Sequence, residues 1–233
     1  MRKKGGLYIY GIVGAEPSEP LGLGIAGEKL RLIGDGGVRA VAGEMDEAPR
    51  PEPATLTAHD AVVRRLTEIV SALLPARFGQ WLPDEPAVTD WLAAHTPELT
   101  EALAQVAGCV QMTLRVYGEP DDSEAKEPPG PEVSPAGGPG TRYLAERRRE
   151  VERERSLPEI APLREALQPL LRGERIERPA APGRLRATAY DLIARGAAAD
   201  YSRIVAEAAP LAGWHVTASG PWPPYAFAPR PVR

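Results

Sequence analysis

Apolar and polar positions alternate most clearly in residues 109–117, CVQMTLRVY. A period of two is typical of a β-strand, because successive side chains point to opposite faces of a sheet. The apolar side chains of this predicted strand share one face and the more polar ones share the other: Val110, Met112, Leu114 and Val116 against Gln111, Thr113 and Arg115. We therefore expect one buried face and one more polar face.

Other segments show either the period of a strand or that of an amphipathic helix. Residues 7–13 are β-branched or aromatic, with apolar residues on both faces, which predicts a central strand. Further strands or extended segments are expected at 30–33, 37–45, 75–82, 173–179, 184–194 and 213–219. Helices are expected from Thr57, as N-cap, to about Leu73, from Asp84 past Leu92, from Pro97 to about 106, over 141–156, after Pro158 to 171, and over 201–208.

A break in composition separates two predicted domains. Residues 118–140 are rich in proline, glycine and acidic residues, so we expect a disordered insertion there. From residue 109 the expected order is strand, helix, strand, strand, helix, strand, which is the split βαβ order of a ferredoxin-like domain. The predicted fold is therefore α+β, with an N-terminal α+β domain (1–108), a modified ferredoxin-like domain (109–219) and a C-terminal tail (220–233).

Composition narrows the class of protein. The 233 residues are 43% hydrophobic and 26% charged, as is typical of globular proteins. The net charge of −4 disfavours a nucleic-acid binder, which would carry a basic surface. No apolar run approaches the length of a membrane span. The single cysteine, Cys109, can form no intrachain disulfide, which fits a reducing cytoplasm.

The segment GLGIAG (22–27) matches the glycine pattern of dinucleotide-binding loops. Such a loop needs a strand before it and a helix after it, so that the N–H groups of the helix meet the pyrophosphate. Here Pro17 and Pro20 separate the loop from the preceding strand, and a strand and a hairpin are expected to follow. We therefore expect no cofactor.

The histidines lie far apart in the sequence and show no metal-ligand spacing. His59 is expected on the surface of a first helical turn, His95 at a helix end and His215 in a strand. Cys109 is expected to be a small buried hydrophobe. We predict no catalytic residue and no metal site.

The RFG sequence at 77–79 is expected in a short extended element between two helices. Arg77 either holds carbonyls or a carboxylate of the chain itself or binds an acidic group of a partner. Phe78 is expected to pack inward. Both roles of the arginine remain open at this point.

Four segments together resemble the gas vesicle protein F/L family, GvpF/GvpL. They are YIYGIV (8–13), LPARFGQ (74–80), GCVQMTLRV (108–116) and GPWPPYAFA (220–228). These segments occur in the same order as in the family and span nearly the whole chain. The second and the last are the most specific of the four.

Two positions depart from the family pattern. Ala226 stands where the tail usually has serine, and Gln111 stands where the strand usually has glutamate. If that glutamate makes a charged contact in the family, this chain replaces it with an amide.

The resemblance implies a non-catalytic accessory protein of gas vesicle assembly, located at the gas vesicle or in the cytoplasm. Its implied partners are the hydrophobic shell protein GvpA and other accessory proteins. It also implies two α+β domains, the second a modified ferredoxin fold. The residues singled out for a structural role or a partner contact are Arg77, Phe78, Gly79, Gln111, Trp222, Pro223, Pro224, Tyr225 and Phe227.

The aromatic tail allows two interpretations. Its rings can pack on the first domain near Arg77 and Phe78, because three prolines restrict it to an extended path. Alternatively the rings are exposed and dock GvpA. Two other functions remain open: a regulatory α+β protein that binds a small molecule at a sheet edge, and an enzyme that uses GLGIAG or the histidines.

Overall fold

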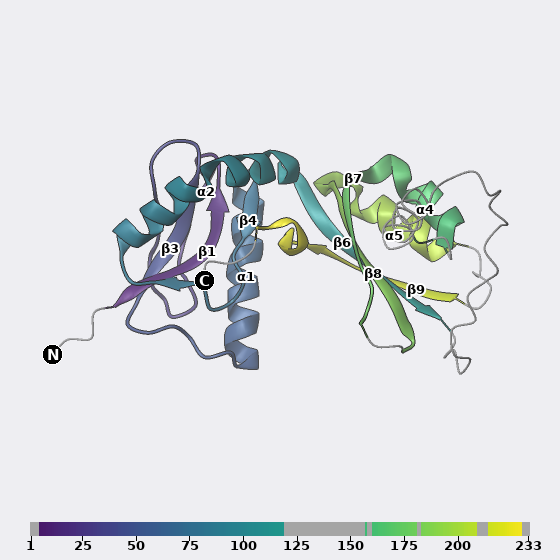
Figure 1. Ribbon diagram of the computed structural model, residues 1–233, viewed down its shortest axis with the longest axis horizontal. Helices are drawn as coiled ribbons and strands as arrows, with labels where there is room; N and C mark the ends of the chain where they lie inside the picture. Colours follow the sequence, from purple (N-terminus) through teal and green to yellow (C-terminus); the bar gives the residue numbers. More distant parts are fainter. Residues whose placement is uncertain (1–4, 119–156, 158–159, 181–182, 209–213, 230–233) are drawn as a thin grey trace, which may run out of the picture. The chain divides into compact units, whose positions relative to one another are not determined.

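The structure, a computed structural model, describes residues 5–118, 157, 160–180, 183–208 and 214–229. Its elements form two sheets with helices beside them (Figure 1), so the predicted α+β class is confirmed. The predicted insertion and the predicted helix over 141–156 lie outside the described residues, apart from Gly118. Among the described residues, no helix is both long and apolar enough to span a membrane.

Two compact units make up the chain. Unit 1 holds residues 1–111, 192–195 and 221–233, and unit 2 holds residues 112–191 and 196–220. Three of the four divisions fall within strands and one within a short 3₁₀ turn, whereas the sequence-based boundary after residue 108 falls between elements.

The sheet of unit 1 is built around β1 (Gly6–Val13). Its strand order is β2 (Leu30–Ile33), β3 (Arg39–Met45), β1 and β4 (Leu73–Pro75), and β5 (Trp81–Leu82) also pairs with β1. All eight residues of β1 are buried, as expected for a central strand. A bulge in the β1–β3 pairing leaves Tyr10 without a partner in β3, and such bulges re-aim a side chain locally.

Helix α1 (Pro53–Ile69) begins earlier than predicted. Its N-cap is Glu52, whose side chain and backbone exchange hydrogen bonds with Thr55 in a capping box. The prediction that Thr57 caps this helix is wrong, and so is the predicted end at Leu73, because β4 already begins there.

Helix α2 (Glu85–Val106) runs through Pro97, so the prediction of two helices here is wrong. A proline inside a helix costs about 3 kcal/mol, because it removes one hydrogen bond and crowds the preceding turn. The apolar stripe continues beyond it with Leu99, Leu103 and Val106, all buried. Each such side chain gains about 1.5–3 kcal/mol on burial, so packing outweighs the proline.

Unit 2 contains a sheet of order β7 (Leu171–Glu177), β8 (Leu185–Ala194), β6 (Cys109–Gly118) and β9 (Trp214–Trp222). Helices α4 (Ala161–Leu167) and α5 (Ala198–Glu207) pack against each other. Short 3₁₀ turns occur at Gln168–Leu170, Arg195–Ala197 and Tyr225–Phe227 (η2, η3 and η4). The assignment of this unit to the ferredoxin-like fold stays a prediction.

Strand β6 is buried on both faces over its first half. Gln111 and Thr113, on the more polar face, are each 5% exposed, so this face is buried as well. A polar side chain can be buried when it finds a hydrogen-bond partner, and Gln111 has one in the C-terminal tail. Strand β9 also runs to Trp222, three residues beyond its predicted end.

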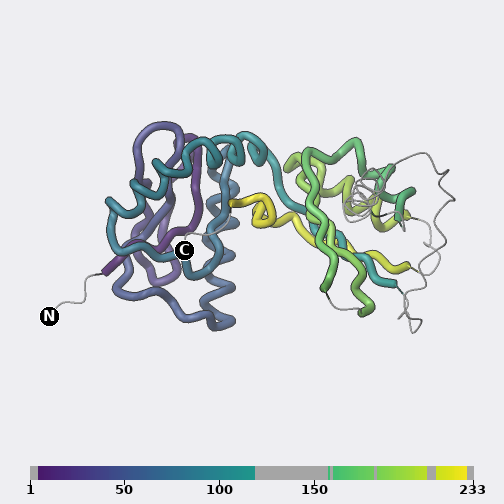
Figure 2. Tube along the Cα trace, in the orientation of Figure 1, coloured from purple at the N-terminus to yellow at the C-terminus, as the bar shows by residue number. Residues whose placement is uncertain are grey.

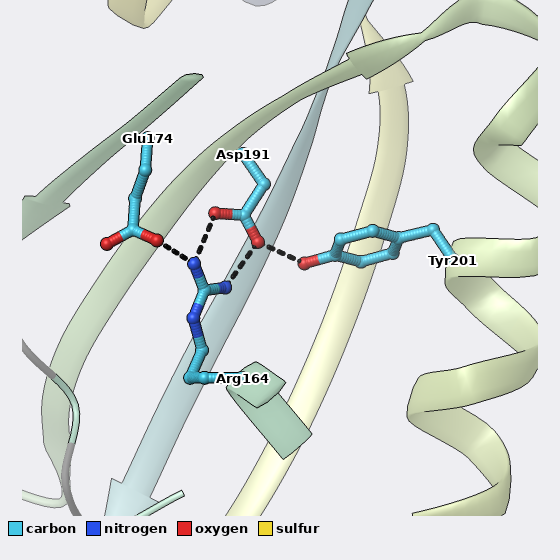
Figure 3. Close-up of polar contacts among 4 residues, drawn as sticks. All are labelled: Arg164, Glu174, Asp191 and Tyr201. Carbon is cyan, nitrogen blue, oxygen red and sulfur yellow. Dashed lines mark hydrogen bonds and ion pairs between the residues drawn. The ribbon is translucent and has the colours of Figure 1, made fainter. Parts of the chain in front are cut away.

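A buried ionic network joins the helices of unit 2 to its sheet (Figure 3). Arg164 of α4 donates two hydrogen bonds to Asp191 of β8, at 2.6 and 3.1 Å, and also pairs with Glu174 of β7. Tyr201 of α5 donates to the same Asp191 carboxylate at 2.6 Å. The Asp191 side chain is 0% exposed. Burial, followed by the Asp191 charge, raises the pKa of Tyr201 well above its usual value.

Replacing Asp191 by alanine should destabilise unit 2 by about 3–5 kcal/mol, because it strands a buried guanidinium. Hydrogen exchange should therefore speed up at the amides of β8 and α5, while the amides of β1 in unit 1 serve as an internal reference. Glu174→Ala is the matched control. The Glu174 side chain is 31% exposed, so its loss should cost about 1 kcal/mol or less. Equal protection in Asp191→Ala and wild type would show that the network contributes nothing.

Candidate functional site

The RFG turn between β4 and β5 is held against β1 by main-chain hydrogen bonds. Ala76 N–H donates to Tyr10 O at 3.0 Å, and Ile9 N–H donates to Gln80 O at 2.9 Å. Gly79 has φ of +89°, a conformation that favours glycine. The turn leaves Arg77 exposed and Phe78 half-buried.

A buried histidine locks this turn. His59 is 3% exposed, with Nε2 3.1 Å from Ala76 O and Nδ1 3.0 Å from Tyr8 Oη. A carbonyl can only accept, so Nε2 carries the proton and the neutral Nδ1 accepts from the Tyr8 hydroxyl. That hydroxyl in turn accepts from Gly79 N–H at 3.2 Å. The hydrogen bonds of His59, direct to Ala76 and through Tyr8 to Gly79, therefore hold the backbone at both ends of the RFG turn.

Aromatic rings surround this histidine. The His59 ring stacks on Tyr10 with centroids 5.6 Å apart, and it meets Phe78 edge-on at the same distance. Burial lowers the pKa of His59, although the hydrogen bond to Ala76 partly offsets the effect. Burial also raises the pKa of Tyr8 to about 12. Both groups are therefore neutral near pH 7, and both ring nitrogens of His59 are engaged within the chain.

The expectation that His59 lies on a first-turn surface is wrong. Because α1 begins at Pro53, His59 lies well inside the helix, on the face that Val62, Val63 and Leu66 share. The i, i+3, i+4, i+7 spacing of these residues in the sequence was the signal that could have placed it in the core.

An apolar groove, hereafter the RFG groove, opens beside this turn in unit 1. It encloses about 530 Å³ of empty space, part of which is open to solvent. Its polar side chains are those of Arg77, Gln80 and Trp91. The lining residues come from the β1 sheet, the RFG turn, α2 and the tail: Ile9, Ile12, Ala40, Leu74, Pro75, Ala76, Arg77, Gln80, Leu82, Val88, Trp91, Leu99, Ala228 and Pro229.

Residues 221–229 of the C-terminal tail belong to unit 1 and run beside α1, and they are drawn in yellow in Figure 2. The Arg64 guanidinium of α1 lies 4.3 Å from the centre of the Trp222 ring, a cation–π contact. Tyr225 packs against the core of this unit. Burial, followed by the charge of Asp60, raises the pKa of the Tyr225 hydroxyl.

The later tail residues are more deeply placed. Pro223, Pro224 and Phe227 are buried, and Phe227 is 2% exposed. Turn η4 lies against β4, so the tail reaches the strand that leads into the RFG turn.

The two departures from the family pattern meet in space. The Ala226 N–H donates to Gln111 Oε1 at 2.8 Å. The main chain of position 226 makes this bond, so alanine serves as well as serine for it. Gln111 supplies a neutral acceptor at a position that is 5% exposed.

The GLGIAG segment forms a tight turn, and two of its N–H groups donate hydrogen bonds to side chains of the same protein. Ile25 N–H donates to Tyr10 Oη, and Ala26 N–H donates to Glu28 Oε2, both at 2.9 Å. A Cβ at Gly24 would lie 2.5 Å from Tyr10 Oη, so the glycine allows this close approach. Strand β2 follows the turn, as expected, and these two N–H groups are already engaged within the chain.

The other histidines and the cysteine lie within helices and strands. His95 lies in the middle of α2, not at a helix end as predicted, and stacks on Trp91 with centroids 4.8 Å apart. His215 lies in β9, as predicted. Cys109 is 7% exposed. Among the described residues, no group of three or more His, Cys, Asp or Glu side chains is arranged to hold a metal ion.

Comparison with known proteins gives consistent matches. A family model described as gas vesicle synthesis protein GvpL/GvpF matches residues 6–229. The chain is 29% identical to gas vesicle protein L2 of Halobacterium salinarum, over 96% of this chain and 91% of that protein. It is 28% identical to gas vesicle protein L of a Streptomyces species, over 95% and 92%.

Two crystal structures share the fold. GvpF from an Anabaena species superposes with a TM-score of 0.69 at 19% identity, covering 97% of both chains. GvpF from Microcystis aeruginosa gives the same TM-score at 18% identity, covering 97% of this chain and 99% of that one. At these identities the structures support the fold alone.

The buried His59 should make unit 1 sensitive to acid. Its folded-state pKa lies below the unfolded value of about 6.5, so the unfolded chain takes up the proton first as the pH falls. Stability is therefore present above about pH 6.5 and is lost below it. His59→Gln keeps an N–H donor for Ala76 but does not titrate.

Urea midpoints from about pH 7.5 to about pH 5 should fall more steeply for wild type than for His59→Gln. All other titratable groups are the same in both proteins, so the difference between the two curves isolates His59. Parallel curves would contradict the assignment of a buried neutral imidazole.

The contact between Gln111 and Ala226 should behave as a coupled pair. Gln111→Glu places a carboxylate at a buried position and should lower the stability of unit 1 by about 1–3 kcal/mol. Adding Ala226→Ser offers a second donor and should recover part of this loss. A double-mutant cycle in urea measures the coupling. Strictly additive effects would show that the two side chains do not interact.

Proposed function

Because the chain belongs to the gas vesicle GvpL/GvpF family, we propose that it is a non-catalytic accessory protein of gas vesicle assembly. In this proposal it binds the hydrophobic shell protein GvpA and other accessory proteins, at the gas vesicle or in the cytoplasm. The observation that carries the proposal is the family match over residues 6–229.

The geometry of unit 1 supports binding over catalysis. Groups with potential reactivity are engaged inside the chain: both nitrogens of His59 have partners, and the Tyr10 hydroxyl donates to Glu28. The RFG groove instead offers apolar surface on a fixed backbone. A preformed apolar surface suits the capture of a sticky subunit, since less order has to be created on binding.

Within this proposal the signature residues have two kinds of role. The rings and prolines of the tail pack on the core of unit 1 and support the wall of the RFG groove. Arg77 is the residue left to meet a partner. The division into domains 1–108 and 109–219 remains part of the proposal.

A regulatory protein that binds a small molecule is the alternative. The RFG groove is the observation that favours it, because ligand pockets are typically apolar with a few polar groups, and this groove combines apolar walls with Arg77 and Gln80. A thermal-shift screen with a metabolite panel distinguishes the two functions: a large shift with one metabolite would favour the alternative.

Co-expression with GvpA tests the proposal. The tagged full chain should retain GvpA through purification, and crosslinking with mass spectrometry should join the two proteins. The tag alone and an unrelated tagged protein of similar charge are the controls. A well-folded chain, verified by circular dichroism, that retains no GvpA would refute the binding function.

A further inference from the structure

We propose that the RFG groove docks a short apolar segment with a carboxylate close to it, supplied by the shell protein. This inference rests on the proposed function and adds the site and the chemistry of recognition. The contact would be a hydrophobic insertion oriented by one ion pair with Arg77.

The RFG groove is mostly apolar. Its floor consists of buried apolar side chains from three elements, and Ile9, Leu74 and Val88 are each 5% exposed or less. Its partly exposed wall adds Leu82, Trp91 and the tail residues Ala228 and Pro229. An apolar occupant that leaves water for this surface is stabilised in proportion to the apolar area it buries.

One positive charge, that of Arg77, lies at the RFG groove. Arg77 is exposed and lines the groove, and no described carboxylate lies within ion-pair distance of it. Ala76, Gly79 and Gln80 on either side of Arg77 are hydrogen-bonded to β1 or His59, so the backbone of the turn is fixed before a partner arrives. A guanidinium on a rigid turn matches a carboxylate in a bidentate geometry, which selects for position as well as charge.

The segments that carry the family resemblance meet at the RFG groove. Segments 8–13 and 74–80, which carry the family resemblance, supply the floor and the turn. The end of segment 220–228 supplies part of the wall through Ala228. Gln111 of segment 108–116 supports this wall, since it accepts from Ala226. The resemblance to gas vesicle proteins is thus concentrated around one apolar groove, and the partner whose chemistry matches it is the hydrophobic shell subunit.

Two pairs of substitutions test the groove, and each pair consists of a groove variant and a control. Arg77→Glu reverses its charge, and Arg50→Glu reverses the charge of another exposed arginine in unit 1. Ala228→Phe fills the groove from its wall, and Ala94→Phe adds the same bulk on the exposed side of α2. Full-length variants are co-expressed with GvpA, and the retained GvpA is quantified after purification.

The groove variants should retain about tenfold less GvpA, equivalent to about 1.4 kcal/mol. Both controls should retain as much as wild type. Changing the partner carboxylate to lysine should restore retention by Arg77→Glu, because the pair is then reversed. Arg77 is exposed, so its variant keeps the test valid even if Ala228→Phe disturbs the tail.

A photo-crosslinker in place of Gln80 identifies the occupant. Crosslinks to an apolar stretch of GvpA with an Asp or Glu within a few residues would support the inference. Crosslinks to a segment without a carboxylate, to a different accessory protein, or to no protein would overturn it.

The outcomes separate the two proposals. If wild type retains no GvpA, the proposed function fails. If wild type and both groove variants retain GvpA equally, the function stands and the groove inference is wrong.

Discussion

The hydrogen bond from His59 to the carbonyl of Ala76 is the constraint on which the rest of unit 1 depends. It joins α1 to the segment after β4, and through Tyr8 the same histidine reaches Gly79. A buried imidazole with both nitrogens satisfied costs little, whereas losing one partner would leave an unsatisfied polar group in the core. The RFG turn is consequently rigid, and its arginine projects from a defined position beside an apolar groove.

Unit 2 solves a similar problem with charge. Asp191 accepts from Arg164 and Tyr201, so one carboxylate ties both helices to the sheet. A buried ion pair is a modest source of net stability, but breaking it is costly, so such networks enforce one arrangement. The buried polar groups of the His59 and Asp191 networks lie outside the RFG groove. They hold helices and strands together, and the groove itself is mostly apolar.

Sequence patterns predicted the parts of the fold that depend on local periodicity. The strand over residues 109–117 follows from a period of two, the central strand β1 follows from apolar residues on both faces, and the cap of α2 at Asp84 follows from residue chemistry. The errors came from long-range packing. Burial of the stripe around Leu99 carried α2 through Pro97, and contacts with Tyr8 and Ala76 drew His59 into the core. The Arg164–Asp191–Tyr201 network was not predicted, because the spacing of residues in the sequence does not indicate hydrogen-bond partners that lie on three separate elements. Sequence also identified Arg77, Gln111 and the tail as notable residues, but their meeting around one groove depends on pairings across more than one hundred residues.

The central claim is that the RFG groove is formed before any partner arrives. Hydrogen exchange at the amides of Ala76 and Gly79 in the isolated full-length protein tests it most directly, because both N–H groups are donated within the chain. The account predicts protection close to that of the β1 amides, with little change when GvpA is bound. Free exchange in the isolated protein, with protection only in the complex, would mean that the partner creates the groove and would contradict the account.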